Sequence, residues 1–241
     1  MFPIGMMAMP KLPVPAHDVR KRVYRICALL LAIACFAFAT VAPLGNSHHR
    51  LLGACYAIPQ DIAFRWPPAW MNRGCGAKEV SQLRLAMREH EFVEGIAGFI
   101  GQTRPDDVFG GEQDVTLYAG NAAARQWQDT ANAYGAAREQ GPIRRHDAGS
   151  GFDLLISPLP DQAMGLTGAF LVSSRKRQLP ATWRAPKCWM ADHAASMRLI
   201  RCTFTIRRDP LVLRFTLTAD NIDKADAVAD LVLARLAAWR R

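Results

Sequence analysis

The sequence lacks the motifs that most often identify an enzyme. It has no glycine-rich phosphate-binding loop, no His-Glu-x-x-His zinc motif and no Gly-x-Ser-x-Gly nucleophile turn. It has no Cys-x-x-Cys pair, and no cysteine has a histidine at the spacing of a zinc site. It also has no internal repeat and no long low-complexity tract. We therefore expect no cofactor, no metal site and no repeat architecture.

One stretch lacks charge altogether. Residues 26–44 are 19 consecutive positions without a charged side chain, just long enough for a helix to cross the hydrocarbon core of a membrane. Five basic residues and one acid precede the stretch, whereas the nearest cation after it is Arg50. This asymmetry predicts a cytoplasmic basic tail over residues 1–25, a transmembrane helix over 26–44, and transfer of the remaining chain across the membrane.

Two interpretations of the apolar stretch compete. It is either a retained anchor or a signal peptide cleaved near Ala39, after the small residues Ala37 and Ala39. We favour the anchor, because a basic region of 25 residues is long for a signal peptide and the apolar run continues past Ala39. The expected location is the bacterial inner membrane, with the N-terminus cytoplasmic and the bulk of the chain periplasmic. Cleavage would make the protein periplasmic or secreted.

The charge of the chain does not indicate a nucleic-acid partner. The formal net charge is +9, but beyond residue 44 there are 25 basic and 20 acidic residues, spread along the chain. Binding to nucleic acid requires a concentrated basic patch. The expected partners are instead the lipid bilayer, through residues 26–44, and another envelope protein.

Four cysteines lie beyond the apolar stretch, and an even number in an exported domain indicates disulfide bonds. Four cysteines allow three connectivities, and we choose the two local pairs, Cys55–Cys75 and Cys188–Cys202. The first pair is expected to hold residues 45–76, an irregular segment with a short strand at 51–58 and the Pro-rich run from Arg65 to Trp70.

Residues 77–241 are expected to form one α+β domain. Val80, Leu83 and Met87 predict a helix over 77–90, and a second helix, with Ala124, Trp127, Ala131 and Tyr134 as its buried stripe, runs from Asn121 to about Gln140. The third helix spans about 223–240, with Asp220 or Asn221 as its cap.

Strands are expected between these helices. Residues 114–119 and 143–147 predict single strands, and 152–157 and 168–173 predict a hairpin with a long loop. Strict alternation over 197–206 and 211–218 predicts a second hairpin, with Arg201, Thr203 and Thr205 on its polar face. The predicted fold is an antiparallel sheet of five or more strands with two or three packed helices, preceded by one transmembrane helix.

Candidate catalytic residues occur only in isolated pairs. His90 and Glu94 would share one face of a helix, but Glu94 stands where a zinc protease requires its second histidine. His146 and Asp147 are neighbours in sequence, so on a strand they would point to opposite faces. A solvated helix face explains the first pair and a loop or strand explains the second. We therefore assign no catalytic residue, although a hydrolase with an unrecognised site around these pairs remains the alternative.

Two features suit binding to another protein. Arg175, Lys176 and Arg177 form a short basic run, which is most often a solvated loop tip. Trp66 and Trp70 flank two prolines and could form an aromatic contact surface, although such a segment is usually covered. The function that best fits is a non-catalytic, membrane-anchored interaction module, which binds an envelope protein or acts as an immunity-type protein against a toxin.

Overall fold

The computed structural model describes residues 27–28, 46–59, 62, 75, 79–101, 112–139, 144–147, 150–161, 166–193 and 196–241. The chain divides into two compact units, Met1–Pro43 and Leu44–Arg241. Of the first unit, only Cys27 and Ala28 are described, and both are helical. The span expected at 26–44 therefore lies almost entirely outside the described residues. Among the residues that are described, no helix is both long enough and apolar enough to cross a membrane.

The second unit begins with a hairpin in the segment that was expected to be irregular. Strands β1 (Asn46–Leu51) and β2 (Ala54–Pro59) pair antiparallel through a tight turn at Leu52 and Gly53, both of which have positive φ. The carbonyl of Arg50 accepts a bond of 2.8 Å from the amide of Val80, and the amide of Ala57 donates one of 2.8 Å to the carbonyl of Trp239. The hairpin is thus joined by backbone bonds to both ends of the domain.

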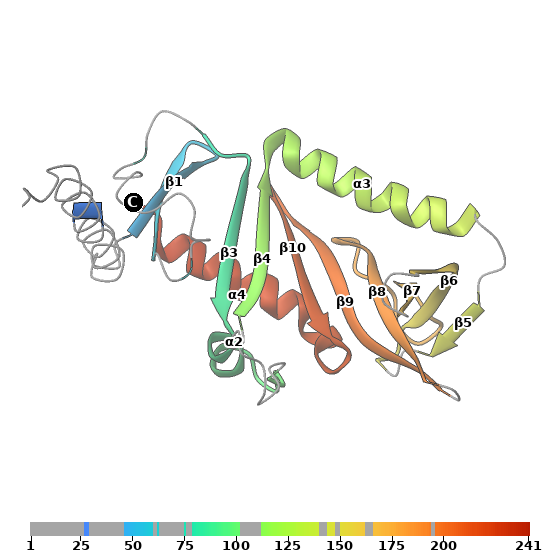
Figure 1. Ribbon diagram of the computed structural model, residues 1–241. Coiled ribbons are helices and arrows are strands. Elements are labelled where there is room, and N and C mark those ends of the chain that lie inside the picture. Colours follow the sequence, from blue (N-terminus) through green and yellow to red (C-terminus); the bar gives the residue numbers. More distant parts are fainter. Residues whose placement is uncertain are drawn as a thin grey trace, which may run out of the picture. The chain divides into compact units, whose positions relative to one another are not determined.

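An eight-stranded antiparallel sheet forms the centre of the second unit (Figure 1). Its strands lie in the order β3-β4-β10-β9-β8-β7-β6-β5, so the last strand of the chain is near the middle. The strands are β3 (Gln82–Arg88), β4 (Glu112–Ala119), β5 (Arg144–Asp147), β6 (Asp153–Asp161), β7 (Leu166–Val172), β8 (Trp183–His193), β9 (Ser196–Arg208) and β10 (Leu211–Thr218). The α+β prediction is confirmed, as are both predicted hairpins.

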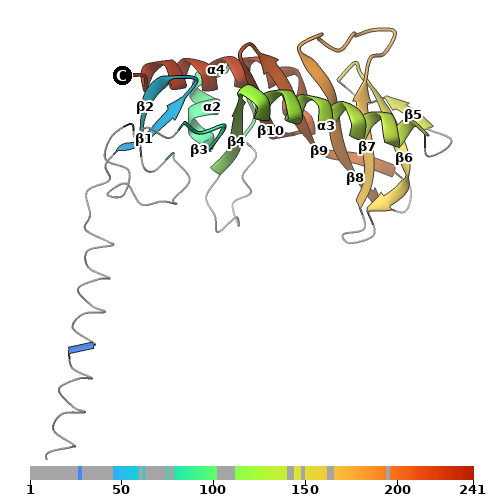
Figure 2. The ribbon, with the colours of Figure 1, turned by 90° about the horizontal axis from the view of Figure 1, so that it is seen from above.

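Two helices lie on opposite sides of this sheet, as Figure 2 shows. Helix α3 (Gly120–Glu139) crosses β4, β10, β9 and β8. Helix α4 (Ala225–Ala238) follows the 3₁₀ helix η2 (Ala219–Lys224) and covers the other face, where it also contacts the short helix α2 (Glu89–Gly95). We name the two sides of the sheet the α3 face and the α4 face.

The α4 face is the hydrophobic core, because alternate residues of neighbouring strands point to the same side of a sheet. Phe204 and Phe215 are buried there with a centroid separation of 5.9 Å, and Trp183 lies 5.1 Å from Phe204. Val228 and Val232 of α4 close the core and are fully buried. Burial of each such side chain stabilises the fold by roughly 1.5–3 kcal/mol, and this face therefore carries most of the hydrophobic stabilisation.

Polar bonds at the rim of the core fix the position of α4. The Arg208 guanidinium lies 2.6 Å from Asp226 and 3.1 Å from Asp230, and Trp183 Nε1 donates a bond of 2.9 Å to Asp226. Partial burial by itself would lower the pKa of Arg208, but its bonds to the two carboxylates outweigh this effect and raise that pKa. The guanidinium thus joins β9 to two turns of α4.

Asn221 has a different role from the helix cap that the sequence suggested. Its side chain is buried in η2, and its amide donates 2.7 Å to the carbonyl of Ile100 while its Oδ1 accepts 2.9 Å from the amide of the same residue. The residue before α4 is Lys224, and it forms no side-chain cap. Asn221 therefore connects η2 to the segment after α2, which is distant in sequence.

The helix predicted over residues 77–90 is wrong. The structure has strand β3 there, with Leu83, Leu85 and Met87 buried against the core. Leu83 and Met87 fit a helical spacing as well as an alternating one, so the pattern alone was ambiguous. Seven register pairs with β4, from Gln82–Tyr118 to Arg88–Glu112, show that a neighbouring strand determined the outcome.

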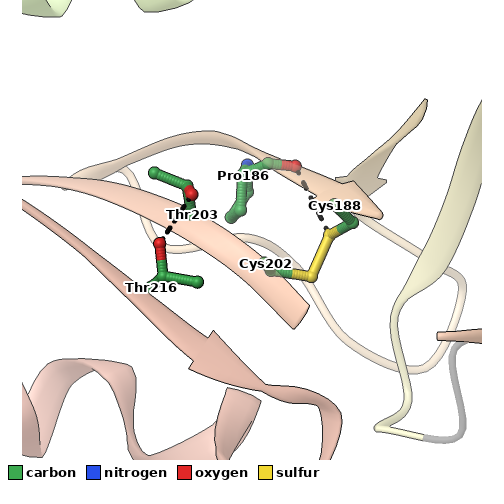
Figure 3. The surroundings of a disulfide bond; sticks show 5 residues. All are labelled: Pro186, Cys188, Cys202, Thr203 and Thr216. Atoms are coloured by element: carbon green, nitrogen blue, oxygen red, sulfur yellow. Dashed lines mark hydrogen bonds between the residues drawn. A yellow bond between two sulfur atoms is a disulfide. The ribbon is translucent and has the colours of Figure 1, made fainter. Parts of the chain in front are cut away.

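Both predicted disulfide bonds are present. Cys188 and Cys202 are direct partners on β8 and β9, with a Cα–Cα distance of 4.0 Å, and both are fully buried (Figure 3). Cys55 and Cys75 are half-buried, with a Cα–Cα distance of 5.7 Å. The first bond supports the sheet at its centre, and the second fixes the hairpin to the segment that follows it. Cys27, in the first unit, is free.

Candidate functional site

Over β3, β4, β10 and β9 the α3 face of the sheet is polar, in contrast to the core on its other side. Over β6 and β7, Leu155, Phe170 and Val172 form a small buried apolar cluster against α3. Register pairs align Arg84 with Thr116, Thr116 with Arg214, and Arg214 with Thr205, across four neighbouring strands. These residues occupy the alternate positions of strands whose other positions are apolar. The alternation in β9 and β10 predicted this polar face, but the sequence did not indicate which other strands would extend it.

Threonine hydroxyls form the floor of this surface. Thr203 of β9 and Thr216 of β10 are direct partners, and their hydroxyl oxygens lie 2.8 Å apart (Figure 3). Thr203 follows Cys202, so the hydroxyl pair and the buried disulfide are on opposite faces of the same strand. Short β-branched side chains leave the middle of the face low, and each retains oxygen lone pairs for a ligand.

Helix α3 lies over this polar face and is held by a few specific contacts. Trp127 lies close to two guanidinium groups, with its ring centroid 4.1 Å from Cζ of Arg184 and 5.9 Å from Cζ of Arg207. Further along the helix, Tyr134 packs edge-on against Phe170 at 5.5 Å. These cation–π and aromatic contacts replace the continuous apolar stripe of an ordinary covering helix.

The buried stripe that the sequence predicted for α3 is partly wrong. Ala124 is exposed, and the one buried residue of the helix is Ala123. Trp127 and Tyr134 do face the sheet, but both remain half-exposed. The helix is therefore only lightly buried, and an open recess runs along it.

Two adjoining hollows lie on the α3 face. The larger, of about 330 Å³, lies between α3 and the sheet, and a second, of about 240 Å³, lies over β3, β4 and β10. Both are lined by Thr203 and Arg214, so these two residues stand where the hollows meet. The remaining lining includes Gln126, Asp129, Thr130, Lys187, Trp189 and Thr205 for the first, and Arg84, Asp114, Thr116, Tyr118 and Thr216 for the second.

Trp189 of β8 lines the larger hollow, and two cations lie close to its ring. The Lys187 ammonium is 5.4 Å from its ring centroid, and Cζ of Arg201 is 5.7 Å from the same centroid. We name the set of Lys187, Trp189, Arg201, Thr203 and Arg214 the cationic groove. The sequence did not indicate that these five residues meet, because they come from three strands that only the sheet brings together.

The basic run at residues 175–177 forms part of an ordered turn between β7 and β8. Ser174 Oγ accepts bonds of 2.9 and 3.0 Å from the amides of Lys176 and Arg177. The Arg177 guanidinium stacks over Phe152 at 4.3 Å and donates 3.1 Å to the carbonyl of Ser150. Arg177 thus acts within the fold, whereas Arg175 and Lys176 are exposed. The predicted three-residue binding run is reduced to two available charges.

The other predicted site residues do not come together. His90 and Glu94 are exposed on α2, directly after β3 at one edge of the sheet. His146 and Asp147 are consecutive on β5, the strand at the opposite edge, and their side chains are not described. Trp66 and Trp70 lie outside the described residues. Seven strand spacings of about 4.8 Å separate β3 from β5, so the two acid–imidazole pairs belong to no common site.

Metal ligands do not gather in the described part of the chain, where no group of three or more His, Cys, Asp or Glu side chains is placed to hold an ion. The chemistry that the α3 face offers is instead that of recognition. It presents fixed cations, hydroxyls and an indole ring on a rigid sheet, which suits non-covalent binding.

Comparison with known proteins gives little further information. No protein-family model matches the chain, and no curated protein matches it. One solved structure that aligns with it is an immunity protein of the Stenotrophomonas maltophilia type IV secretion system. The alignment has 11% identity and a TM-score of 0.28, and it covers 82% of this chain and 94% of that chain. A similarity at this level does not establish a shared fold.

Proposed function

We propose that this protein is a non-catalytic binding module of the bacterial envelope. Residues 26–44 hold it in the inner membrane, and the domain on the far side binds a partner protein through the α3 face. The observation that carries the proposal is the contrast between the two faces of one sheet: one is closed by α4 over a continuous core, and the other keeps two hollows beside a lightly buried helix.

The disulfide bonds support the extracytoplasmic part of the proposal. Structural disulfides persist in oxidising compartments and are rare in the cytosol. Here one bond lies in the core and the other anchors the hairpin, so both are integral to the domain. The charge asymmetry around residues 26–44 directs the domain to the extracytoplasmic side of the membrane. The disulfide bonds are consistent with that side, because they require an oxidising compartment.

The rigidity of the α3 face supports a binding role. Its cations and hydroxyls project from paired strands whose opposite sides are locked in the core. A preorganised surface loses little conformational entropy when a partner binds, and this favours affinity. The partner would be another envelope protein or, in an immunity-type role, an incoming toxin. The weak likeness to an immunity protein is compatible with the second form, but its score is too low to add support.

Site-specific photo-crosslinking in intact cells tests the binding role. Benzoylphenylalanine is placed at Gln126 or Thr216, which line the two hollows, and at Ala234, which is exposed on α4 away from both. We expect a discrete crosslinked protein from the hollow positions and none from Ala234. Absence of any hollow-specific product, or the same products from all three positions, would refute the proposal.

Intact-mass measurement tests the location. The protein is taken from membrane and soluble fractions and alkylated with and without prior reduction. Full-length mass in the membrane, with four cysteines blocked until reduction, is the expected result. A soluble product that begins near Thr40 would replace the anchor with a cleaved signal peptide. A protein with six free thiols would contradict the extracytoplasmic location.

A further inference from the structure

We infer that the cationic groove binds an extended, acidic segment of the partner protein. This inference rests on the proposed function and specifies the chemistry that its partner must present. The groove carries three cations, Lys187, Arg201 and Arg214, all of them exposed. Within the described residues, none of the three forms an ion pair, and the structure gives the two cations beside Trp189 only their cation–π contacts.

The cations of the groove differ from several others in the domain, which are ion-paired within the fold. Arg208 is bonded to Asp226 and Asp230, Arg84 is bonded to Asp114, and Arg235 lies 3.3 Å from Glu91. Those charges are neutralised within the fold. Lys187 and Arg214 instead line the larger hollow, where the neighbouring acid of α3 is Asp129, and Arg201 lies beside Trp189 of the same hollow. An excess of positive charge in a hollow attracts acidic ligands and concentrates them there.

The groove is also arranged to hold carboxylates once they arrive. A guanidinium offers parallel N–H donors that match a carboxylate, and Arg214 presents these where the two hollows meet. Lys187 and Arg201 each lie close to the Trp189 ring, which limits their rotamer freedom before a ligand binds. The hydroxyls of Thr203 and Thr216 lie between these cations and offer donors to a ligand backbone or side chain.

The shape of the site favours a chain segment over a compact molecule. The two hollows together run from α3 across β9 and β10 to β3, and they share Thr203 and Arg214. An extended peptide advances about 3.3 Å per residue and can pass across several strands spaced about 4.8 Å apart. A partner segment with several Asp or Glu residues therefore fits both the charge and the length of the groove.

An anionic membrane is the competing source of negative charge, and the geometry disfavours it. The larger hollow is bounded on one side by α3, so a flat lipid surface would meet the helix before it reached Thr203 or Arg214. The charges that a membrane would reach first are protruding ones, such as Arg175 and Lys176 in the β7–β8 turn. A narrow peptide is not restricted in this way.

The test uses the full-length protein in nanodiscs of zwitterionic lipid. The probe is a fluorescein-labelled peptide of ten glutamates, with a ten-glutamine peptide as the control ligand, followed by fluorescence anisotropy at low salt. The groove variant combines Lys187→Gln, Arg201→Gln and Arg214→Gln. The matched control variant combines Arg125→Gln, Arg138→Gln and Arg240→Gln, which removes the same charge from exposed positions outside the groove.

We expect the glutamate peptide, and not the glutamine peptide, to bind the wild type and the control variant. The groove variant should bind it roughly tenfold more weakly or worse, because a hydrogen bond to a charged group is worth about that factor or more. Added salt should weaken binding in the wild type by screening. Equal affinity of the two triple variants for the glutamate peptide would overturn the inference. It would also be overturned if the protein did not bind the peptide but bound phosphatidylglycerol vesicles through the groove cations.

Failure here is distinguishable from failure of the proposed function. Binding of the glutamate peptide could prove independent of the groove cations while crosslinks from Gln126 or Thr216 persist. In that case the inference of an acidic partner segment is wrong, but the proposed binding module is still supported. If those crosslinks are also missing, the α3 face has no protein partner. Circular dichroism of both triple variants should show that they remain folded, because all six substituted side chains are exposed.

Discussion

The two faces of the central sheet show how one set of strands can serve two purposes. On the α4 face, Phe204, Leu213 and Phe215 are buried against a helix whose inward residues are apolar. On the α3 face, the same strands present Thr203, Thr205 and Arg214 to a helix that touches them at only a few points. Stability is concentrated on one side, so the other side is free to carry polar groups that contribute little to folding.

The largest expected difference is in the stability lost when two adjacent residues of β9, one on each face of the sheet, are replaced. Phe204→Ala removes a fully buried ring from the α4 face and should lower the free energy of unfolding by about 3–5 kcal/mol. Thr203→Ala, one position away, removes a hydroxyl pair on the α3 face and should cost about 1 kcal/mol. Urea denaturation followed by circular dichroism, with the disulfides intact, measures both. Similar losses would show that the two faces are not divided in this way.

A smaller effect is expected at the contact that holds α3. Trp127→Ala removes the ring that contacts Arg184 and Arg207 and should reduce stability by about 1–2 kcal/mol. The change should be local, so hydrogen exchange should quicken in residues 120–139 and remain slow in α4. Gln128→Ala, an exposed position on the same helix, is the matched control. Global loosening of α4 by the Trp127 substitution would show that α3 is part of the core.

The smallest effect concerns pH and the hairpin. Burial, and secondarily the neighbouring His48, lower the pKa of His49 below its ordinary value of 6.5, and its Nε2 lies 2.7 Å from Ser47 Oγ. A lowered pKa means that the unfolded chain binds a proton more readily, so stability is present above pH 6.5 and is lost as pH falls through the folded pKa.

Hydrogen exchange of the β1 and β2 amides at neutral and mildly acidic pH checks this prediction. Exchange should quicken in the hairpin on acidification, and less so on β8 and β9. His49→Gln should remove the difference between the two pH values. A hairpin whose protection is unchanged by acid in the wild type would contradict the shift. The effect should be smaller than that of Trp127→Ala, because a single half-buried imidazole is involved.

The elements that were predicted correctly are those with an unambiguous local pattern in the sequence. The alternating runs at 197–206 and 211–218 predicted a hairpin that the structure confirms with eight register pairs. The local spacing of the cysteines predicted both disulfide bonds. By contrast, Leu83 and Met87 fitted two periods, and the helix predicted around them is a strand. The transmembrane span at 26–44 stays a prediction, because it rests on hydropathy and flanking charge alone.

The candidate site was less predictable than the fold, for a physical reason. The polar positions of β9 and β10 were visible as alternation, but Lys187 and Trp189 joined them only when β8 paired with β9. The run from Arg175 to Arg177 showed the reverse effect. It is contiguous in sequence, yet Arg177 turns inward to stack on Phe152, which lies before β6.

Local chemistry by itself therefore determined the fold class, the two predicted hairpins, two of the three helices and the cysteine pairs, since each depends on residues that are close in the chain. Tertiary structure alone decided that residues 82–88 are a strand, that Asn221 binds Ile100, and that three unpaired cations from three strands share one groove. These outcomes depend on long-range pairing, which brings together side chains that no sequence spacing relates.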